Sequence, residues 1–184
     1  MKKLILTAAA VFALGIANGQ EQTAKGKLLV EVNTGFGDNG TAGLGGVGGT
    51  GLRFESSDGS SAYNIGAEGG YFIMDNLALK IGLGFGGVSQ KVGDGSTLIG
   101  YKVGAKYYVS GMIPLEVSYN GTSSSPSVEG QKNPSYVGIQ GGYAVFLGDM
   151  VSLEPGIRYN YALLSKEDGG LSFLQFNIGF VLHF

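Results

Sequence analysis

The last twelve residues, FLQFNIGFVLHF (Phe173–Phe184), alternate strictly between two kinds of side chain. Every second residue from Leu174 to Phe184 is large and apolar, whereas the residues between them, such as Gln175 and Asn177, are mostly polar or small. A period of two is typical of a β-strand with one apolar face. The apolar pattern continues to Phe184, so this whole face must be covered. The fold depends on whether a protein core or lipid covers it.

The same alternation recurs along the chain and predicts eight strands. These are Lys27–Gly37, Ala62–Ile73, Leu77–Val88, Thr97–Ser110, Pro114–Asn120, Ser135–Leu147, Val151–Leu163 and Leu171–Phe184. Three connections are tight: Met74–Asn76, Gly111–Ile113 and Gly148–Met150. The other four are longer and polar, and long and short connections alternate. This order predicts an antiparallel meander with short turns at one end and loops at the other.

The two faces of these strands differ in charge. The apolar face carries no charged residue, and the opposite face carries four acids and four bases among Gly, Ser, Asn and Gln. The charged residues are Glu31, Glu68, Lys80, Lys102, Lys106, Glu116, Glu154 and Arg158. A soluble barrel would show a wet face dense in charge, but this face is thinly charged and made of small residues, which suit the interior of an eight-stranded barrel.

We therefore interpret the apolar face as the lipid face. A charge there costs about 2–4 kcal/mol at the middle of the bilayer, which explains why none is present. An open sheet edge is not viable in lipid, so the meander must close. The predicted fold is all-β, an eight-stranded antiparallel up-and-down transmembrane β-barrel. Aromatic residues near the strand ends fit interfacial girdles. They are Phe36, Tyr71, Tyr107, Tyr143, Tyr159, Tyr161 and Phe184.

The N-terminal residues have the layout of a secretory signal peptide. Two lysines precede the apolar run Leu4–Ile16, and Ala17 and Gly19 are small residues before a cut at Gln20. We assign residues 1–19 to the signal peptide and 20–184 to the barrel; an N-terminal anchor helix is the alternative. Removal of Lys2 and Lys3, with no acid, takes the net charge from −2 to −4, which argues against nucleic-acid binding. With no cysteine, disulfides and thiol chemistry are excluded.

Two stretches resemble a known family. GGYFIMDNLALKIGLGFG (Gly69–Gly86) looks like the second strand, periplasmic turn and third strand of small Gram-negative outer-membrane β-barrels of the OmpX/OmpA-barrel kind, often labelled porin-family. The ending FVLHF, with Phe180, Leu182 and Phe184, looks like the C-terminal signal read by the outer-membrane assembly machinery. The resemblance covers the whole mature chain. It implies an outer-membrane location, a periplasmic C-terminus and four outward loops.

The inward charges are expected to pair with one another. Lys106 and Glu116 are each five residues from Gly111, so the hairpin should place them opposite one another, and Glu68 and Lys80 flank the Met74–Asn76 turn. Glu154 and Arg158 share one face of one strand. Our hypothesis is a neutral cluster that plugs the lumen, because paired buried charges are roughly neutral in stability. A selectivity filter or a proton path is the alternative.

Two features depart from a regular barrel. Pro155 lies within the seventh predicted strand, where it lacks an amide donor, so we expect a bulge or a lost ladder bond there. The stretch RFESSDGSSAYNI (Arg53–Ile65) is expected to extend as a hairpin above the membrane. Counting residues 50–55 as a separate spanning strand would give nine strands. Bacterial single-chain barrels have even strand counts, so we do not count it.

Catalytic and cofactor motifs find little support. GLGGVG (Gly43–Gly48) matches a dinucleotide-binding pattern, but no helix follows it, so we interpret it as loop. The single histidine, His183, is expected at the periplasmic rim without a catalytic serine. No metal, calcium or cofactor site is predicted.

The predicted function is non-enzymatic. The chain is expected to be a structural or surface-exposed envelope protein in contact with outer-membrane lipid, with an unknown partner possible at its extracellular loops. A narrow passive pore for small solutes is the alternative, and a soluble periplasmic ligand-binding barrel is a further one.

Overall fold

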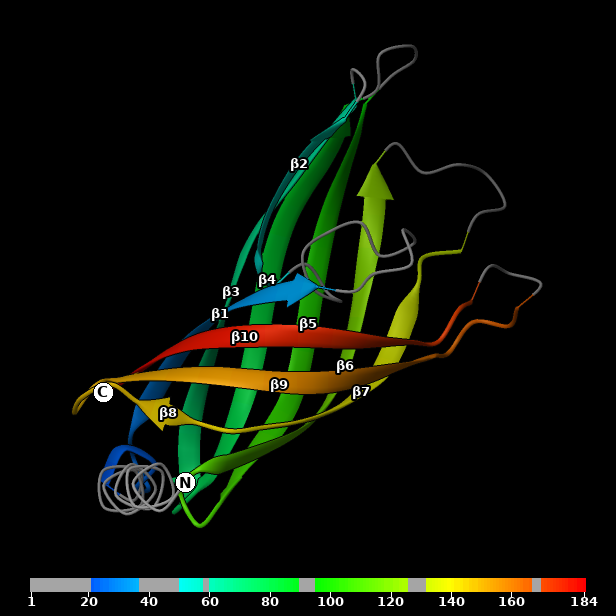
Figure 1. Ribbon diagram of the computed structural model, residues 1–184. Helices are drawn as coiled ribbons and strands as arrows, with labels where there is room; N and C mark the ends of the chain where they lie inside the picture. Colours follow the sequence, from blue (N-terminus) through cyan, green and yellow to red (C-terminus); the bar gives the residue numbers. More distant parts are fainter. Residues whose placement is uncertain (1–20, 37–49, 58–59, 90–94, 126–131, 167–169) are drawn as a thin grey trace, which may run out of the picture.

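The computed structural model describes residues 21–36, 50–57, 60–89, 95–125, 132–166 and 170–184 (Figure 1). The predicted signal peptide and the Gly43–Gly48 motif lie outside these ranges. No helix in the described part of the chain is long and apolar enough to cross a membrane. The strands are β1 (Leu28–Phe36), β2 (Leu52–Ser57), β3 (Ser60–Met74), β4 (Leu77–Ser89), β5 (Ser96–Val109), β6 (Ile113–Ser125), β7 (Ser135–Gly142), β8 (Val145–Phe146), β9 (Val151–Ala162) and β10 (Phe173–His183).

All strands belong to one antiparallel sheet that closes on itself. Its order is β1-β10-β9-β7-β6-β5-β4-β3-β2, and β1 also pairs with β3, which closes the ring. The closing ladder joins Leu28–Glu31 to Tyr71–Glu68. At the turn end, Leu28 and Phe184 exchange two backbone hydrogen bonds of 2.9 and 3.0 Å, so the C-terminal residue takes part in closure. The predicted eight-stranded barrel is confirmed.

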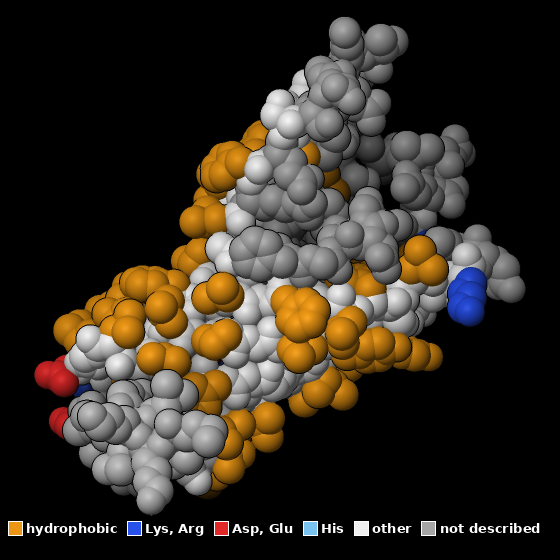
Figure 2. Space-filling view, in the orientation of Figure 1, with side chains coloured by type: hydrophobic (Ala, Val, Ile, Leu, Met, Phe, Trp, Pro, Cys, Tyr) orange, Lys and Arg blue, Asp and Glu red, His pale blue; other side chains and the backbone are white. Residues whose placement is uncertain are grey.

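The barrel is apolar outside and polar inside, as predicted. Leu79, Ile81 and Val103 are 51%, 69% and 52% exposed, whereas Lys80 and Glu154 are each 1% exposed. In Figure 2, apolar side chains cover the visible wall and charged ones appear only near its two ends. This surface suits hydrocarbon rather than water, because it places large apolar side chains outward and removes charges from the surface. A soluble ligand-binding barrel would have the reverse arrangement.

The expected single strand Ser135–Leu147 is split, and this prediction was wrong. β7 ends at Gly142 and β8 resumes at Val145. The pairs on either side of the break are Gly142↔Gly156 and Val145↔Leu153. The two pairs are three residues apart on each strand, so the register is unchanged and there is no bulge. Tyr143 donates its N–H to the carbonyl of Pro155 at 3.0 Å, but proline has no N–H to return the bond. The expected lost ladder bond at Pro155 is therefore confirmed.

β2 forms a hairpin with β3 and is not a ninth wall. Leu52–Ser57 pairs with Ile65–Ser60, along the part of β3 that lies beyond the ladder with β1. Among the described strands β2 pairs with β3 alone, and a single bridge joins Gly51 to Asn33 of β1. This agrees with the predicted hairpin and with the even strand count.

Candidate functional site

The eight predicted inward charges all lie in the lumen. They come from six strands: Glu31 on β1, Glu68 on β3, Lys80 on β4, Lys102 and Lys106 on β5, Glu116 on β6, and Glu154 and Arg158 on β9. None is more than 6% exposed. Because side chains alternate along a strand, one face of each strand delivers these groups to the barrel axis.

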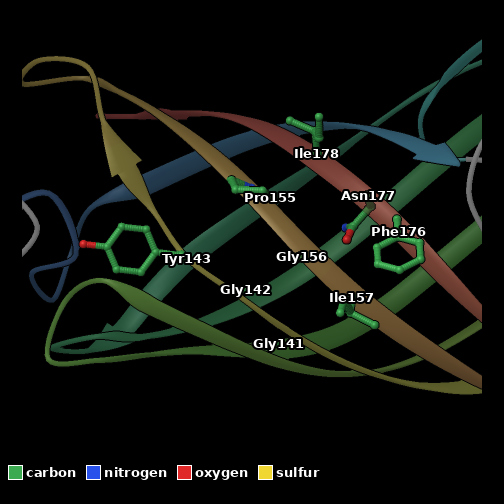
Figure 3. Close-up of a pocket in the computed structure, with 9 residues that line it drawn as sticks. All are labelled: Gly141, Gly142, Tyr143, Pro155, Gly156, Ile157, Phe176, Asn177 and Ile178. Carbon is green, nitrogen blue, oxygen red and sulfur yellow. The ribbon is translucent and has the colours of Figure 1, made fainter. Parts of the chain in front are cut away.

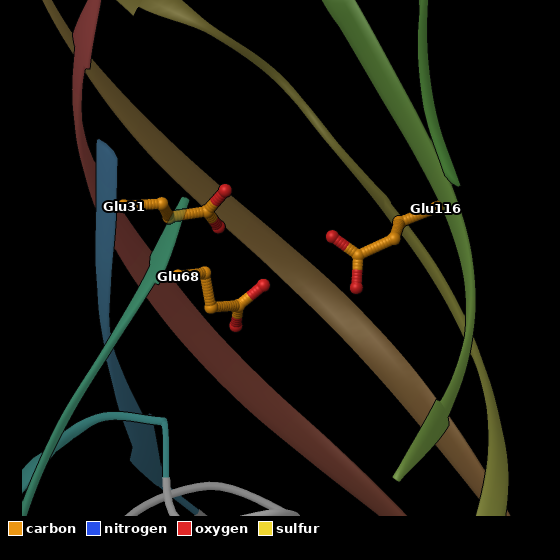
Figure 4. A group of neighbouring side chains, drawn as sticks. All are labelled: Glu31, Glu68 and Glu116. Carbon is orange, nitrogen blue, oxygen red and sulfur yellow. The ribbon is translucent and has the colours of Figure 1, made fainter. Parts of the chain in front are cut away.

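Lys80 is the centre of this lumen charge cluster. Its Nζ lies 2.6 Å from Glu31, 2.7 Å from Glu68 and 2.7 Å from Glu116. Figure 4 shows the three carboxylates pointing toward a common centre from three different strands. Glu31 and Glu68 are also direct register partners in the closing ladder, where like charges repel. The Lys80 ammonium therefore compensates an acidic pair at the seam of the barrel.

The other three cations complete a neutral network. Lys106 pairs with Glu31 at 2.7 Å and Glu154 at 2.5 Å, and Lys102 pairs with Glu68 at 2.8 Å and Glu116 at 2.6 Å. Arg158 pairs with Glu116 at 3.0 Å. Each carboxylate thus contacts at least one cation, and four acids balance four bases.

The expected pairs are partly the observed ones. Glu68 and Lys80 form an ion pair at 2.7 Å. Lys106 and Glu116 are register partners, as expected, but each forms its ion pairs with other residues. Arg158 likewise contacts Glu116 and not Glu154. The physical reason is the narrow lumen, because long side chains from opposite walls meet at the axis and do not have to pair along their own hairpin.

Glycines in the wall make room for these long side chains. A Cβ added to Gly138 would lie 1.9 Å from the Nη2 of Arg158, and one at Gly82 would lie 2.9 Å from the Cγ of Glu68. The abundance of glycine on the inward face is therefore a packing requirement of the cluster, and the sequence pattern already showed it as small inward residues.

Amide and hydroxyl groups surround the cluster on the loop side. Arg158 donates to Asn160 at 2.8 Å, to Asn120 at 2.8 Å and to Ser118 at 2.5 Å. Glu68 accepts hydrogen bonds from Thr50 at 2.8 Å and from Asn33 at 3.2 Å. These neutral donors and acceptors satisfy the buried charges further, which lowers the cost of their burial.

An apolar layer, which the sequence analysis did not predict, closes the turn end of the lumen. The inward side chains of Leu29, Phe72, Ala78, Tyr108, Ala144 and Val181 pack together there. Below them, the segment 21–26 docks against the turns. Gln22 donates to the carbonyl of Gly148, and Thr23 donates to the Oδ1 of Asn76 at 2.6 Å. The available signal was the pair of aromatic residues, Phe72 and Tyr108, on inward positions near the turns.

His183 is buried in this layer and has a serine neighbour, contrary to our expectation of a rim histidine. It is 2% exposed, and its Nε2 lies 3.0 Å from the Oγ of Ser152. The nearby acid, Glu154, accepts from that same Oγ at 3.1 Å. Within the described residues no carboxylate hydrogen-bonds the Nδ1. The pair therefore lacks the acid that orients the base in a catalytic triad, and three aromatic rings pack around the imidazole.

The carboxylates of Glu31, Glu68 and Glu116 approach within 4.8 Å of one another, a spacing at which such groups can hold a metal ion. Here the Lys80 ammonium lies between them and supplies the compensating charge. The arrangement is an ion-pair cluster built around a lysine.

No family model matches the chain, and no curated protein matches it. Several solved structures are similar in fold. The N-terminal β-barrel domain of Pseudomonas aeruginosa OprF is 14% identical, with 87% of this chain and 98% of that chain covered and a TM-score of 0.46. The Yersinia pestis outer membrane protein Ail is 9% identical, with 87% and 100% covered and a TM-score of 0.46. A designed transmembrane β-barrel is 14% identical, with 87% and 97% covered and a TM-score of 0.44.

These likenesses are distant, and the assignment of this chain depends on its own strand ladder and surface. The closed antiparallel ring, the apolar outer wall and the charged interior make it a transmembrane β-barrel.

Proposed function

We propose that the chain is an integral outer-membrane protein without enzymatic activity, whose lumen is plugged by the lumen charge cluster and whose loops face the cell exterior. It serves as a structural or surface-exposed envelope protein. The observation that carries this proposal is the network around Lys80, in which eight buried charges from six strands meet across the axis.

The network supports a plug because it is neutral and saturated. A conducting filter presents charges to a water path, but here every carboxylate contacts a cation at 3.0 Å or less. An eight-stranded barrel leaves an interior that side chains fill. The apolar layer and segment 21–26 add a second obstacle at the turn end.

Single-channel recording in planar bilayers tests the plug. The purified barrel should give no steady conductance steps. A variant that combines Lys80→Ala and Arg158→Ala with Phe72→Ala and Tyr108→Ala should give them, because it removes two long side chains from the axis and two rings from the apolar layer. Lys25→Ala, at an exposed position outside the barrel wall, is the matched control. Steady steps from the unchanged protein would refute the plug and favour the narrow solute pore.

The non-enzymatic part of the proposal is supported by the buried Ser152–His183 pair, which lacks an orienting acid on the histidine. Hydrolysis of ester or peptide substrates that is lost in Ser152→Ala while the barrel remains folded would contradict it.

The C-terminal residues are proposed to act as the signal for the outer-membrane assembly machinery. Phe180 and Phe184 are 44% and 49% exposed on the outer wall, and Phe184 is hydrogen-bonded to β1. Replacing Phe184 by Ser should reduce insertion by the machinery in cells, yet leave spontaneous folding into detergent nearly unchanged. An equal loss in both settings would show that Phe184 contributes only to barrel stability.

A further inference from the structure

The outer wall contains an open groove where β7, β9 and β10 adjoin. Its volume is about 530 Å³. Figure 3 shows its walls, formed by the side chains of Tyr143, Ile157, Phe176 and Ile178, with glycines between them. The lining residues are Gly141, Gly142, Tyr143, Pro155, Gly156, Ile157, Phe176, Asn177 and Ile178.

The missing outward side chain at Gly141 and the break between β7 and β8 form the groove. Gly141 occupies an outward position, and a Cβ there would lie 3.5 Å from the Cδ2 of Leu115, in ordinary contact. Gly142 and Gly156 are register partners that face the lumen, and the outward residue between Tyr143 and Ile178 is Pro155, whose ring is compact. The ladder is also interrupted beside them, because Pro155 has no N–H to donate. At Gly141 the outer face of the wall is reduced to backbone.

The groove is continuous with the lipid-facing surface. Leu115, Ile157 and Phe176 around it are 46%, 48% and 54% exposed, like the rest of the apolar wall. Water is a poor occupant, because a stable buried water needs about two to four polar partners and the outward side chains that flank this groove are mainly apolar. The Asn177 side chain faces the lumen, where it donates to the Oδ1 of Asn33. Hydrocarbon from the bilayer is the occupant that matches this lining.

We propose that this groove binds one acyl chain of a phospholipid from the surrounding bilayer, held between Phe176 and Tyr143 over Gly141. A chain in the groove contacts protein on three sides, whereas a chain on the flat wall contacts it on one. More contact atoms give more dispersion energy, so the groove lipid exchanges more slowly than its neighbours. The inference depends on the membrane placement proposed above.

Photo-crosslinking in detergent-free nanodiscs tests the site. The probe is a phosphatidylcholine with a diazirine in one acyl tail, and labelled peptides are identified by mass spectrometry. Labelling should concentrate on the peptides that contain Tyr143, Ile157 and Phe176, several-fold above those that contain Ile81 and Leu83 of β4.

The key variant is Gly141→Leu, which fills the floor and should abolish the excess labelling. Gly141→Ala adds a single methyl group and should reduce it in part. The matched control is Gly69→Leu, at an outward glycine on β3 with nothing within 4 Å of an added Cβ, and it should leave the labelling unchanged.

Each variant is first checked for a closed barrel by its migration on unheated gels and for insertion by flotation with the lipid. A barrel that inserts but labels evenly around its wall, or labels equally in Gly141→Leu, overturns the groove site alone. A chain that fails to float with lipid overturns the membrane placement instead.

Discussion

Removal of the Lys80 ammonium is the most direct test of how the interior is held together. In Lys80→Met the side chain keeps a similar length, but Glu31, Glu68 and Glu116 each lose a partner at 2.6–2.7 Å. Glu31 and Glu68 then face each other in the closing ladder without the cation between them. The seam of the barrel should therefore lose stability first.

The expected loss of stability in Lys80→Met follows from the burial of the ion pairs that Lys80 forms. Breaking a fully buried ion pair by removing one partner costs about 3–5 kcal/mol, because the other charge stays buried without compensation. The three glutamates keep Lys106, Lys102 and Arg158 as partners, so we expect the lower part of that range. Adding Glu68→Gln restores neutrality and removes the like charge opposite Glu31. We expect it to recover about 0.5–3 kcal/mol as a coupling energy.

The assay is urea unfolding of the barrel in lipid vesicles, followed by the fraction that migrates as closed barrel on unheated gels. Lys25→Met, which changes an exposed lysine outside the strands, is the control. If Lys80→Met unfolds at the same urea concentration as Lys25→Met, or if Glu68→Gln destabilises the variant further, the account of the cluster is refuted.

Three further substitutions, two of them with a matched control substitution, test the lipid face and the interior by the same unfolding assay. Val103→Lys places a charge in the middle of the lipid face and should cost about 2–4 kcal/mol, whereas Ser123→Lys near the loop end should cost little, and equal effects would argue against the lipid assignment. Gly138→Val should displace Arg158 and cost about 1–3 kcal/mol by overpacking, while Gly69→Val, with open space around it, should be tolerated. Ser152→Ala leaves the His183 Nε2 without its hydroxyl partner and should cost about 1–3 kcal/mol; an unchanged unfolding midpoint would show that the contact is not a stabilising hydrogen bond.

Much of this fold was predictable because a barrel wall repeats a simple local rule. Successive side chains of each strand point alternately to lipid and to the lumen, so the alternation alone assigned Leu79 to the outside and Lys80 to the inside. The missing donor of Pro155 was predictable as well, since it is a covalent property of the residue. The split of the Ser135–Leu147 run was missed because its apolar pattern continues through the break. The apolar turn-end layer was missed because it depends on which inward residues meet across the barrel.

The sequence by itself determined the faces of the strands, the inside-out orientation and the closure of the sheet, because these follow from a period of two and from the cost of placing charge or unpaired backbone in lipid. Only the tertiary structure decided the partners: Lys80 among three glutamates, Arg158 with Glu116, Ser152 with His183, and the groove over Gly141. These contacts join residues far apart in the chain, and the tilt and stagger of the strands set their distances. The local sequence pattern carries no information about the tilt and stagger of the strands or about these distances.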